Sequence, residues 1–564
     1  MSEEKTTESR TLVPFETIGL CFSGGGYRAT FFALGVLSYL EQINYKNSPL
    51  LASVKALSTV SGGTLTGVGF AKALQEKSYN FKSFFQDFYN TFTPQNDQLL
   101  STAIKKFEDD AVWEKSSKKR TLINAFALAY ADMPIFDGSF KHFKKNNINQ
   151  LEQVCFNATD FSYGLTFRIQ NQGYFGNTPL YKTNQKQVNA LRDQIILGDA
   201  IASSSCFPVG FEPMIFPDDY FEDHNDPDYK TLKEIDLFID GVGIMDGGIA
   251  DNQGIGSMML INERMDDGMN LIIVNDVGSY KMKPWEQDTT EISNGSSLKR
   301  IINKALNYFS LKPLYWITFT IGLLIVLLNN MLVFGPQAYS GLYILGSAIM
   351  GSGLLLSIFG IVASVLKSTL VSKIKGIFKR NVPEPLMDDI LSFQKLDISL
   401  IQRMLSDRFT SAMTMINDVF LKQIRRLNYD LFYSKKELEH RRITATIYKL
   451  NGKPTPYSKG NGVNPNIEPK PSKALESVCL TASEMPTTLW WDKTDVSKNR
   501  MEALIACGEI TICYELMDYI LKLKEADKIP EKDSSAIDEL YKNLVQDWKN
   551  FNIQPLWLVD KLKK

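Results

Sequence analysis

The strongest constraint on this chain of 564 residues is the stretch 313–366, which contains no Asp, Glu, Lys, Arg or His. A helix that crosses a bilayer needs about 20 mostly apolar residues. The stretch holds two such runs, 314–334 and 341–366, separated by a Gly-Pro turn. We therefore expect two transmembrane helices joined as a hairpin, in preference to a buried helical hairpin of a soluble protein.

Both flanks of this hairpin are basic, and neither contains an acid between Ser297 and Arg380. Because positive charge stays on the cytoplasmic side of a membrane, both ends of the hairpin are expected in the cytosol. The polar, acid-containing start of the chain is unlike a secretory signal and agrees with this orientation. The flanking basic residues are Lys299, Arg300, Lys304 and Lys312 on one side and Lys367, Lys373, Lys375, Lys379 and Arg380 on the other.

Composition excludes several classes of protein. The 62 Lys and Arg residues balance 63 Asp and Glu residues, so the chain lacks the basic excess of a nucleic-acid binder. Its six cysteines have no CxxC spacing, which argues against a zinc ribbon or a disulfide scaffold. An acidic stretch at 217–228 lacks the glycine-centred spacing of a calcium loop. We expect no metal and no cofactor.

Alternating strands and helices predict an α/β fold before the hairpin. Buried-strand patterns at 16–22, 54–60 and 270–278 favour a mostly parallel sheet with helices on both faces. The expected organisation is a disordered N-terminus (1–14), the first part of a catalytic domain (15–296), the hairpin with its basic flanks (297–380) and a C-terminal part (381–564). That last part is mainly helical, with a strand at 443–450 and a surface loop at 451–473, and is expected to complete or pack on the catalytic domain.

The first glycine-rich site is Ser58-Thr59-Val60-Ser61-Gly62-Gly63, between a strand and a helix. A nucleophile elbow needs this arrangement, because a tight turn exposes one serine hydroxyl and small neighbours permit the strained backbone. Thr59 stands where the usual G-x-S-x-G motif has its first glycine. An ordinary turn with Ser61 as a helix N-cap remains the alternative.

The second site is Ser23-Gly24-Gly25-Gly26-Tyr27-Arg28, again between a strand and a helix. Successive glycines allow backbone N–H groups to point at an anion, and the helix N-terminus adds its positive end. The same residues also fit the dinucleotide fingerprint G-x-G-x-x-A. Against that alternative, no acid ends a clear second strand about 20 residues further on.

The third site is Asp246-Gly247-Gly248, which follows an apolar run. An aspartate at the end of a strand and the start of a glycine turn can project into a site without steric cover. The simpler alternative is an Asp-Gly turn with no chemical role.

Together, and in this order, the three sites resemble the patatin-like phospholipases. Further similarity lies at 156–169, at the Ser-Ser-Ser-Cys-Phe-Pro segment within 197–213, and at 500–511, which would make the hairpin an insertion in the family's three-layer α/β fold. Thr59 departs from the family's usual glycine.

The resemblance implies a Ser–Asp dyad that cleaves phospholipid acyl esters, as a phospholipase A does, without histidine. Ser61 would be the nucleophile and Asp246 the proton acceptor, a poor base unless burial raises its pKa. The implied partners are the phospholipid bilayer and its lipids; a homo-oligomer stays open, and no regulator is indicated. The implied oxyanion hole comprises Gly24, Gly25 and Gly26, with Arg28, Gly63, Gly247 and Gly248 in support.

Three other functions stay open at this point. A hydrolase could use a triad of Ser61, Asp246 and His440, although His440 and the other two histidines, His142 and His224, all lie in charged segments typical of a protein surface. The hairpin could instead oligomerise into a membrane assembly whose α/β domain only binds lipid. A nucleotide-dependent reductase is the third.

Overall fold

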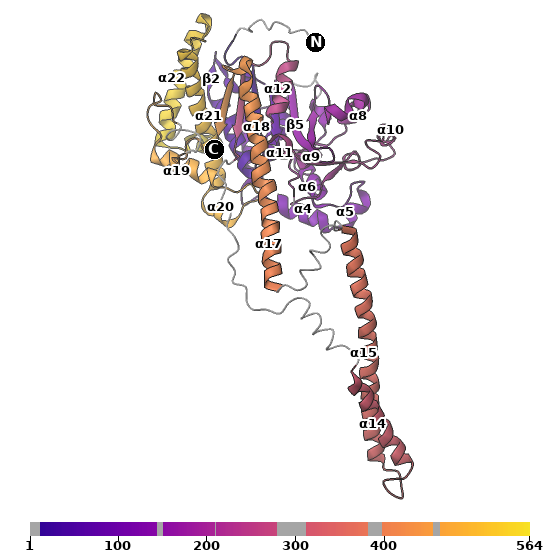
Figure 1. Cartoon of the computed structure of the whole chain (residues 1–564). Coiled ribbons are helices and arrows are strands. Elements are labelled where there is room, and N and C mark those ends of the chain that lie inside the picture. The colour runs from indigo at the N-terminus through magenta and orange to yellow at the C-terminus, as the bar shows by residue number, and fades with distance from the viewer. Residues whose placement is uncertain (1–11, 144–149, 209, 279–311, 382–397, 455–462) are drawn as a thin grey trace. The chain divides into compact units, whose positions relative to one another are not determined.

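The computed structural model describes residues 12–143, 150–208, 210–278, 312–381, 398–454 and 463–564 (Figure 1). The chain folds into two compact units. Unit 1 comprises Met1–Met282 and Asn417–Lys564, and unit 2 comprises Lys283–Ile416. Unit 2 is thus inserted in the sequence of unit 1. The expected disordered N-terminus lies outside the described residues except for Leu12, Val13 and Pro14.

A mixed, mostly parallel sheet forms the centre of unit 1, which confirms the expected α/β class. Its strand order is β10-β9-β1-β4-β5-β8-β7, with β6 also paired to β5. The neighbours from β10 to β5 are parallel, whereas β6 and β8 run antiparallel to β5, and β7 runs antiparallel to β8. The strands are β1 (Ile18–Phe22), β4 (Val54–Val60), β5 (Gln153–Asp160), β6 (Leu165–Gln170), β7 (Met214–Phe216), β8 (Val242–Asp246), β9 (Leu271–Asp276) and β10 (Arg442–Thr446).

Helices cover both faces of this sheet. Strand side chains alternate between faces, so Leu20 joins a large core with α1 and α21, whereas its neighbour Cys21 joins a smaller core with α12 and α18. Strands β1, β5 and β9 are buried along their whole length, as expected for strands covered on both sides. These helices are α1 (Gly26–Gln42), α12 (Ile255–Arg264), α18 (Leu421–Ser434) and α21 (Arg500–Glu525).

The part of the chain after unit 2 supplies one edge strand and a covering helix of unit 1. Strand β10 pairs with β9, and α21 packs on α1. The helices α1 and α21 touch backbone to backbone at two glycines, because a Cβ on Gly35 would lie 1.9 Å from the Ile505 carbonyl oxygen and one on Gly508 would lie 2.2 Å from that of Phe32. Helix α1 begins in the glycine-rich loop, so α21 supports the helix that carries this loop.

Unit 2 contains two helices that are long and apolar enough to cross a membrane, α14 (Pro313–Asn330) and the first part of α15 (Ser340–Asn381). They lie side by side in Figure 1. Helix α14 ends earlier than the expected residue 334, and α15 continues well past 366. The turn between them is closed by Asn329, whose side-chain amide donates to the Tyr339 carbonyl oxygen (3.0 Å) and accepts from its N–H (3.0 Å).

Glycines form the contact between these two helices. A Cβ on Gly322 would lie 2.3 Å from the backbone nitrogen of Met350, and one on Gly353 would lie 2.5 Å from that of Phe319. Small residues permit such close approach of membrane helices. Of the flanking basic residues, Lys299, Arg300 and Lys304 lie outside the described part of the chain, as do residues 455–462 of the expected surface loop.

Candidate active site

Ser61 occupies a strained turn between β4 and α2 (Gly62–Ala73). Its backbone angles, φ 50° and ψ −123°, lie in a region that residues with a side chain rarely adopt. The two glycines that follow are required by close packing. A Cβ on Gly62 would lie 2.0 Å from the Gly26 carbonyl oxygen, and one on Gly63 would lie 2.7 Å from that of Ser23. This geometry is that of a nucleophile elbow and not of a simple helix cap, since the Ser61 side chain makes no capping hydrogen bond.

Thr59 fits this elbow although it replaces the motif's usual glycine. Its hydroxyl lies 2.9 Å from the hydroxyl of Thr64, in the first turn of α2. Its methyl group occupies space left by Gly67, where a Cβ would lie 2.6 Å from that methyl carbon. The absence of a side chain at Gly67 therefore makes room for Thr59.

The strand β5 brings Ser61 and Asp246 together. Strand β6 pairs along one side of β5, and the other side is shared by β4 and β8. Val60, at the end of β4, pairs with Asn157, while Asp246, at the end of β8, pairs with the next residue, Ala158. Because β4 and β8 run in opposite directions, their carboxyl ends meet there, and the Ser61 hydroxyl lies close enough to the Asp246 carboxyl group to lower its pKa.

Asp246 is only 7 % exposed, and burial raises its pKa to about 6. Two hydrogen bonds oppose this shift, one from the Ser61 hydroxyl and one from the Gly248 N–H, whose nitrogen lies 2.7 Å from Oδ1. Gly247 allows the turn to pass close to β5, since a Cβ there would lie 2.3 Å from the Asn157 carbonyl oxygen. A carboxylate with this pKa is a much better proton acceptor than an exposed aspartate.

Ser204, which the sequence alone did not single out, links the elbow to the aspartate turn. Its hydroxyl accepts from the Ser61 N–H (2.8 Å) and donates to the Asn157 carbonyl oxygen (2.7 Å). Its own carbonyl oxygen accepts from the Gly247 N–H (3.2 Å). Ser204 ends α9 (Leu197–Ser204), in a segment quoted above only for its family resemblance. Three successive serines gave no sign of which one makes these contacts.

The glycine-rich loop lies directly against Ser61. A Cβ on Gly24 would lie 3.1 Å from that of Ser61. The Gly24 N–H donates to the Asn252 carbonyl oxygen (2.9 Å), and the Tyr27 N–H donates to that of Thr488 (2.7 Å). Between them, the N–H groups of Gly25 and Gly26 have no hydrogen-bond partner within the described part of the chain. Gly25 and Gly26 therefore have the donors best placed to bind an anion, while Gly24 provides close approach.

Arg28 fastens this loop to the C-terminal part of unit 1. It is buried, and its guanidinium donates to the Met485 carbonyl oxygen (2.9 Å). Burial lowers the pKa of this guanidinium below its usual value. The segment that contains Met485 and Thr488 also packs closely against the loop, since a Cβ on Gly26 would lie 2.3 Å from the Thr488 carbonyl oxygen. This position supports a role for Arg28 in stabilising the loop.

The three histidines lie apart from these groups. His440 precedes β10, at the amino ends of the parallel strands, whereas Ser61 follows the carboxyl end of β4. At about 3.3 Å per residue, the length of β4 separates these levels by roughly 20 Å. His142 bonds the Ser139 carbonyl oxygen, and His224 stacks on Tyr229.

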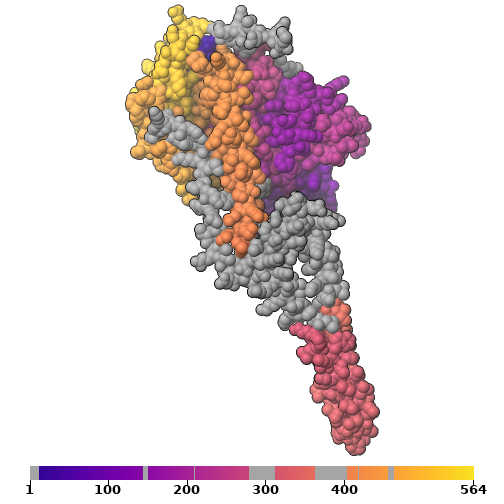
Figure 2. All heavy atoms as spheres, viewed as in Figure 1, coloured from indigo at the N-terminus to yellow at the C-terminus, as the bar shows by residue number. Residues whose placement is uncertain are grey.

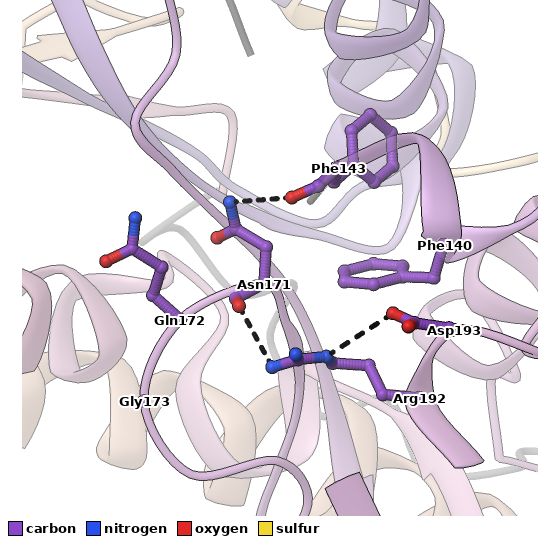
Figure 3. Close-up of a pocket in the computed structure, with 7 residues that line it drawn as sticks. All are labelled: Phe140, Phe143, Asn171, Gln172, Gly173, Arg192 and Asp193. Carbon is purple, nitrogen blue, oxygen red and sulfur yellow. Dashed lines mark hydrogen bonds and ion pairs between the residues drawn. The ribbon is translucent and has the colours of Figure 1, made fainter. Parts of the chain in front are cut away.

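A cavity of about 410 Å³ lies elsewhere in unit 1 (Figure 3). Arg192 crosses it and donates to the Asn171 carbonyl oxygen (2.9 Å). None of its lining residues belongs to the glycine-rich loop, the elbow or the aspartate turn. They are Phe140, Phe143, Asn171, Gln172, Gly173, Arg192 and Asp193.

Comparison with known families agrees with this geometry. The model of the patatin-like phospholipases matches residues 20–259, which include the glycine-rich loop, Ser61 and Asp246. No protein of curated function matches the chain. The match and the α/β fold together identify a patatin-like phospholipase domain at residues 20–259, which implies a lipid acyl hydrolase activity.

Proposed function

We propose that this chain is a membrane-anchored phospholipase of the A type, which cleaves acyl esters with a dyad of Ser61 and Asp246. The observation that carries the proposal is that β5 brings Ser61 and Asp246 together at the ends of β4 and β8, in a buried setting that raises the pKa of Asp246 to about 6. A base of this pKa is largely ionised at neutral pH and still accepts a proton more readily than an exposed carboxylate.

In the first step, Ser61 Oγ attacks the ester carbonyl carbon as its proton passes to Asp246. The negative charge moves to the carbonyl oxygen, where the Gly25 and Gly26 N–H groups stabilise it; one such donor is worth about 3–4 kcal/mol. Collapse of this tetrahedral intermediate breaks the bond to the alcohol oxygen. The proton on Asp246 passes to that oxygen, so a lysophospholipid leaves and the acyl group stays on Ser61.

In the second step, water replaces the alcohol. Asp246 takes a proton from the water as its oxygen attacks the acyl carbon, and the oxyanion again lies against Gly25 and Gly26. Collapse releases the fatty acid and returns the proton to Ser61. The strained backbone at Ser61 supports this role, because strain of this kind is concentrated at functional sites.

Membrane anchoring is the second part of the proposal. Helices α14 and α15 would span the bilayer as a hairpin, with both ends on the cytosolic side, and hold unit 1 near its insoluble substrate. The basic residues on both flanks would favour anionic lipids. Membranes washed at alkaline pH should retain the full chain and lose a chain without residues 313–366. Full-length protein in the soluble fraction would contradict the anchor.

The catalytic part is tested by release of fatty acid and lysophospholipid from vesicles of phosphatidylcholine and phosphatidylglycerol, followed by mass spectrometry. Ser61→Ala and Asp246→Asn should each lower release by at least about 10³-fold, because residues that act as a unit fail together. Ser101→Ala, at an exposed helical serine, is the matched control.

Two results would redirect the proposal. Equal release by the wild type and both dyad variants would leave the dyad without a role. Loss of activity in His440→Ala, which should behave like the wild type, would point to a triad despite the position of His440.

A further inference from the structure

Helix α18 lies near the start of the part of unit 1 that follows unit 2, since Ile416 ends unit 2 and α18 begins at Leu421. It contacts elements that carry both halves of the proposed site. Figure 2 shows α18, in orange, as an exposed strip on the surface of unit 1. Its outward side chains, Leu427 and Leu431, are half exposed, whereas Arg425 is buried.

The first contact is with the aspartate turn. The Asn428 side-chain amide donates to Asp251 Oδ1 (3.2 Å) and lies 3.4 Å from the Ala250 carbonyl oxygen. Ala250 and Asp251 belong to α11 (Gly248–Asp251). The first residue of that short helix is Gly248, whose N–H donates to Asp246. Asn428 is thus one helical turn away from the hydrogen bond that stabilises ionised Asp246.

The second contact is with the end of β9, beside the glycine-rich loop. Arg425 forms a buried ion pair with Asp276 (2.8 Å), and the Tyr429 hydroxyl donates to the same carboxylate (2.7 Å). The next residue, Val277, donates its N–H to the Ser23 hydroxyl (3.0 Å). A Cβ on Gly25 would lie 2.7 Å from the Val277 side chain. Arg425 and Tyr429 therefore hold the segment against which the oxyanion loop rests.

We propose that Asn428, Arg425 and Tyr429 are positioning residues for ester hydrolysis, and that α18 holds the aspartate turn and the glycine-rich loop in register. The inference rests on the proposed function and names a part of the chain outside the family match, which ends at residue 259. In the sequence, α18 also follows the membrane hairpin, with α17 (Ile398–Thr414) between them.

The test compares Asn428→Ala with Gln423→Ala in the full-length chain, in vesicles. Both remove an amide from α18, but Gln423 is exposed. A soluble short-chain nitrophenyl ester reports the pH dependence of kcat/KM, and hydrogen–deuterium exchange of the 246–254 segment reports the order of α11 without any catalysis. Tyr429→Phe, which keeps the ion pair, tests the second contact by kcat.

Asn428→Ala should loosen α11 and weaken the Gly248 hydrogen bond to Asp246. Besides the Gly248 N–H, the described groups that interact with the Asp246 carboxylate are the Ser61 hydroxyl and the Cys206 thiol, and both are uncharged. Loss of a bond that lowers its pKa moves the acidic limb of kcat/KM to higher pH, by about half a unit or more. We expect faster exchange at 246–254 and a kcat about tenfold lower, since small misplacements of catalytic groups are costly. Tyr429→Phe should lower kcat severalfold with the acidic limb unmoved, and should speed exchange selectively at the glycine-rich loop, 23–28, which loss of folded protein would not do.

A purely structural role gives a different result. Loss of folded protein lowers the rate equally at every pH and leaves the limb in place. The inference is overturned if Asn428→Ala matches Gln423→Ala in both limb position and exchange. If the wild type cleaves no ester while Asn428→Ala still speeds exchange, the contact to α11 stands and the proposed activity is what fails.

Discussion

Val60 and Asp246 pair with consecutive residues of β5, Asn157 and Ala158, on the same side of that strand. This relationship places the residue after Val60, which is Ser61, beside a carboxylate from a distant part of the sequence. The positions of Ser61 and Asp246 are set by the ends of β4 and β8, so no loop has to fold over the site to bring the two residues together. The rigidity of a sheet therefore sets the geometry of the proposed dyad.

The pH dependence of hydrolysis should report Asp246. Its carboxyl group must be ionised to accept the Ser61 proton, and its pKa is raised to about 6 by burial. Activity should therefore be low below pH 6, rise through about pH 6 and level off above it. In kcat, measured with bound lipid, the limb should lie at higher pH than in kcat/KM, because the acyl chain excludes more water from the carboxylate. A limb near pH 4 for both would show that Asp246 is not the base.

Substitutions at Ser61 should separate backbone strain from chemistry. Ser61→Ala and Ser61→Gly both remove the hydroxyl, but only glycine adopts the backbone angles of Ser61 without strain. We expect the glycine variant to be more stable than the alanine variant by about 1 kcal/mol. At a site inside a helix, such as Ala536 in α22 (Glu531–Ile553), replacement by glycine should instead destabilise by about 0.5–1 kcal/mol. Chemical denaturation measures these differences in the free energy of unfolding. Equal stabilities of the Ser61→Ala and Ser61→Gly variants would argue against backbone strain at Ser61.

Much of this site follows from local sequence. A glycine turn after a buried strand indicated the elbow, the glycine-rich loop and the aspartate turn, and each lies at the carboxyl end of its strand. The contact between Ser61 and Asp246 did not follow from the sequence itself. It depends on β5 and on the antiparallel direction of β8, which are long-range pairings that leave no periodic signal.

Other features were hidden for different reasons. Asn329 lies in an apolar run, and its contacts with Tyr339 close the turn that follows α14, which ends at Asn330. Hydropathy alone does not locate such a turn, so the predicted helix was too long. Gly24 was grouped with its neighbours as an oxyanion donor, yet its N–H bonds to Asn252, a residue far away in the sequence.

The fit of Thr59 to the elbow predicts that positions 59 and 67 are coupled in a double-mutant cycle. In the wild type, Gly67→Ala should destabilise the protein, because the new methyl group would meet the Thr59 methyl carbon at 2.6 Å. Thr59→Ser removes that methyl group and keeps the hydroxyl that bonds Thr64. In this background, Gly67→Ala should be less harmful or stabilising, by up to about 1 kcal/mol, since alanine favours a helix. Additive effects in denaturation would contradict the contact.

The glycine contact between α14 and α15 predicts a position-specific effect. Gly353→Leu should separate α14 from α15, because a side chain there meets the backbone of Phe319. Gly351→Leu is the matched control, since a Cβ at Gly351 has nothing within 4 Å. Energy transfer between fluorophores at the exposed positions Ile317 and Leu356 should fall for Gly353→Leu alone, in detergent and in vesicles. Packing rather than hydrophobicity drives association of helices in lipid, so two leucines of equal hydropathy should differ. Equal transfer in the two variants would mean that these glycines do not set the distance between the helices.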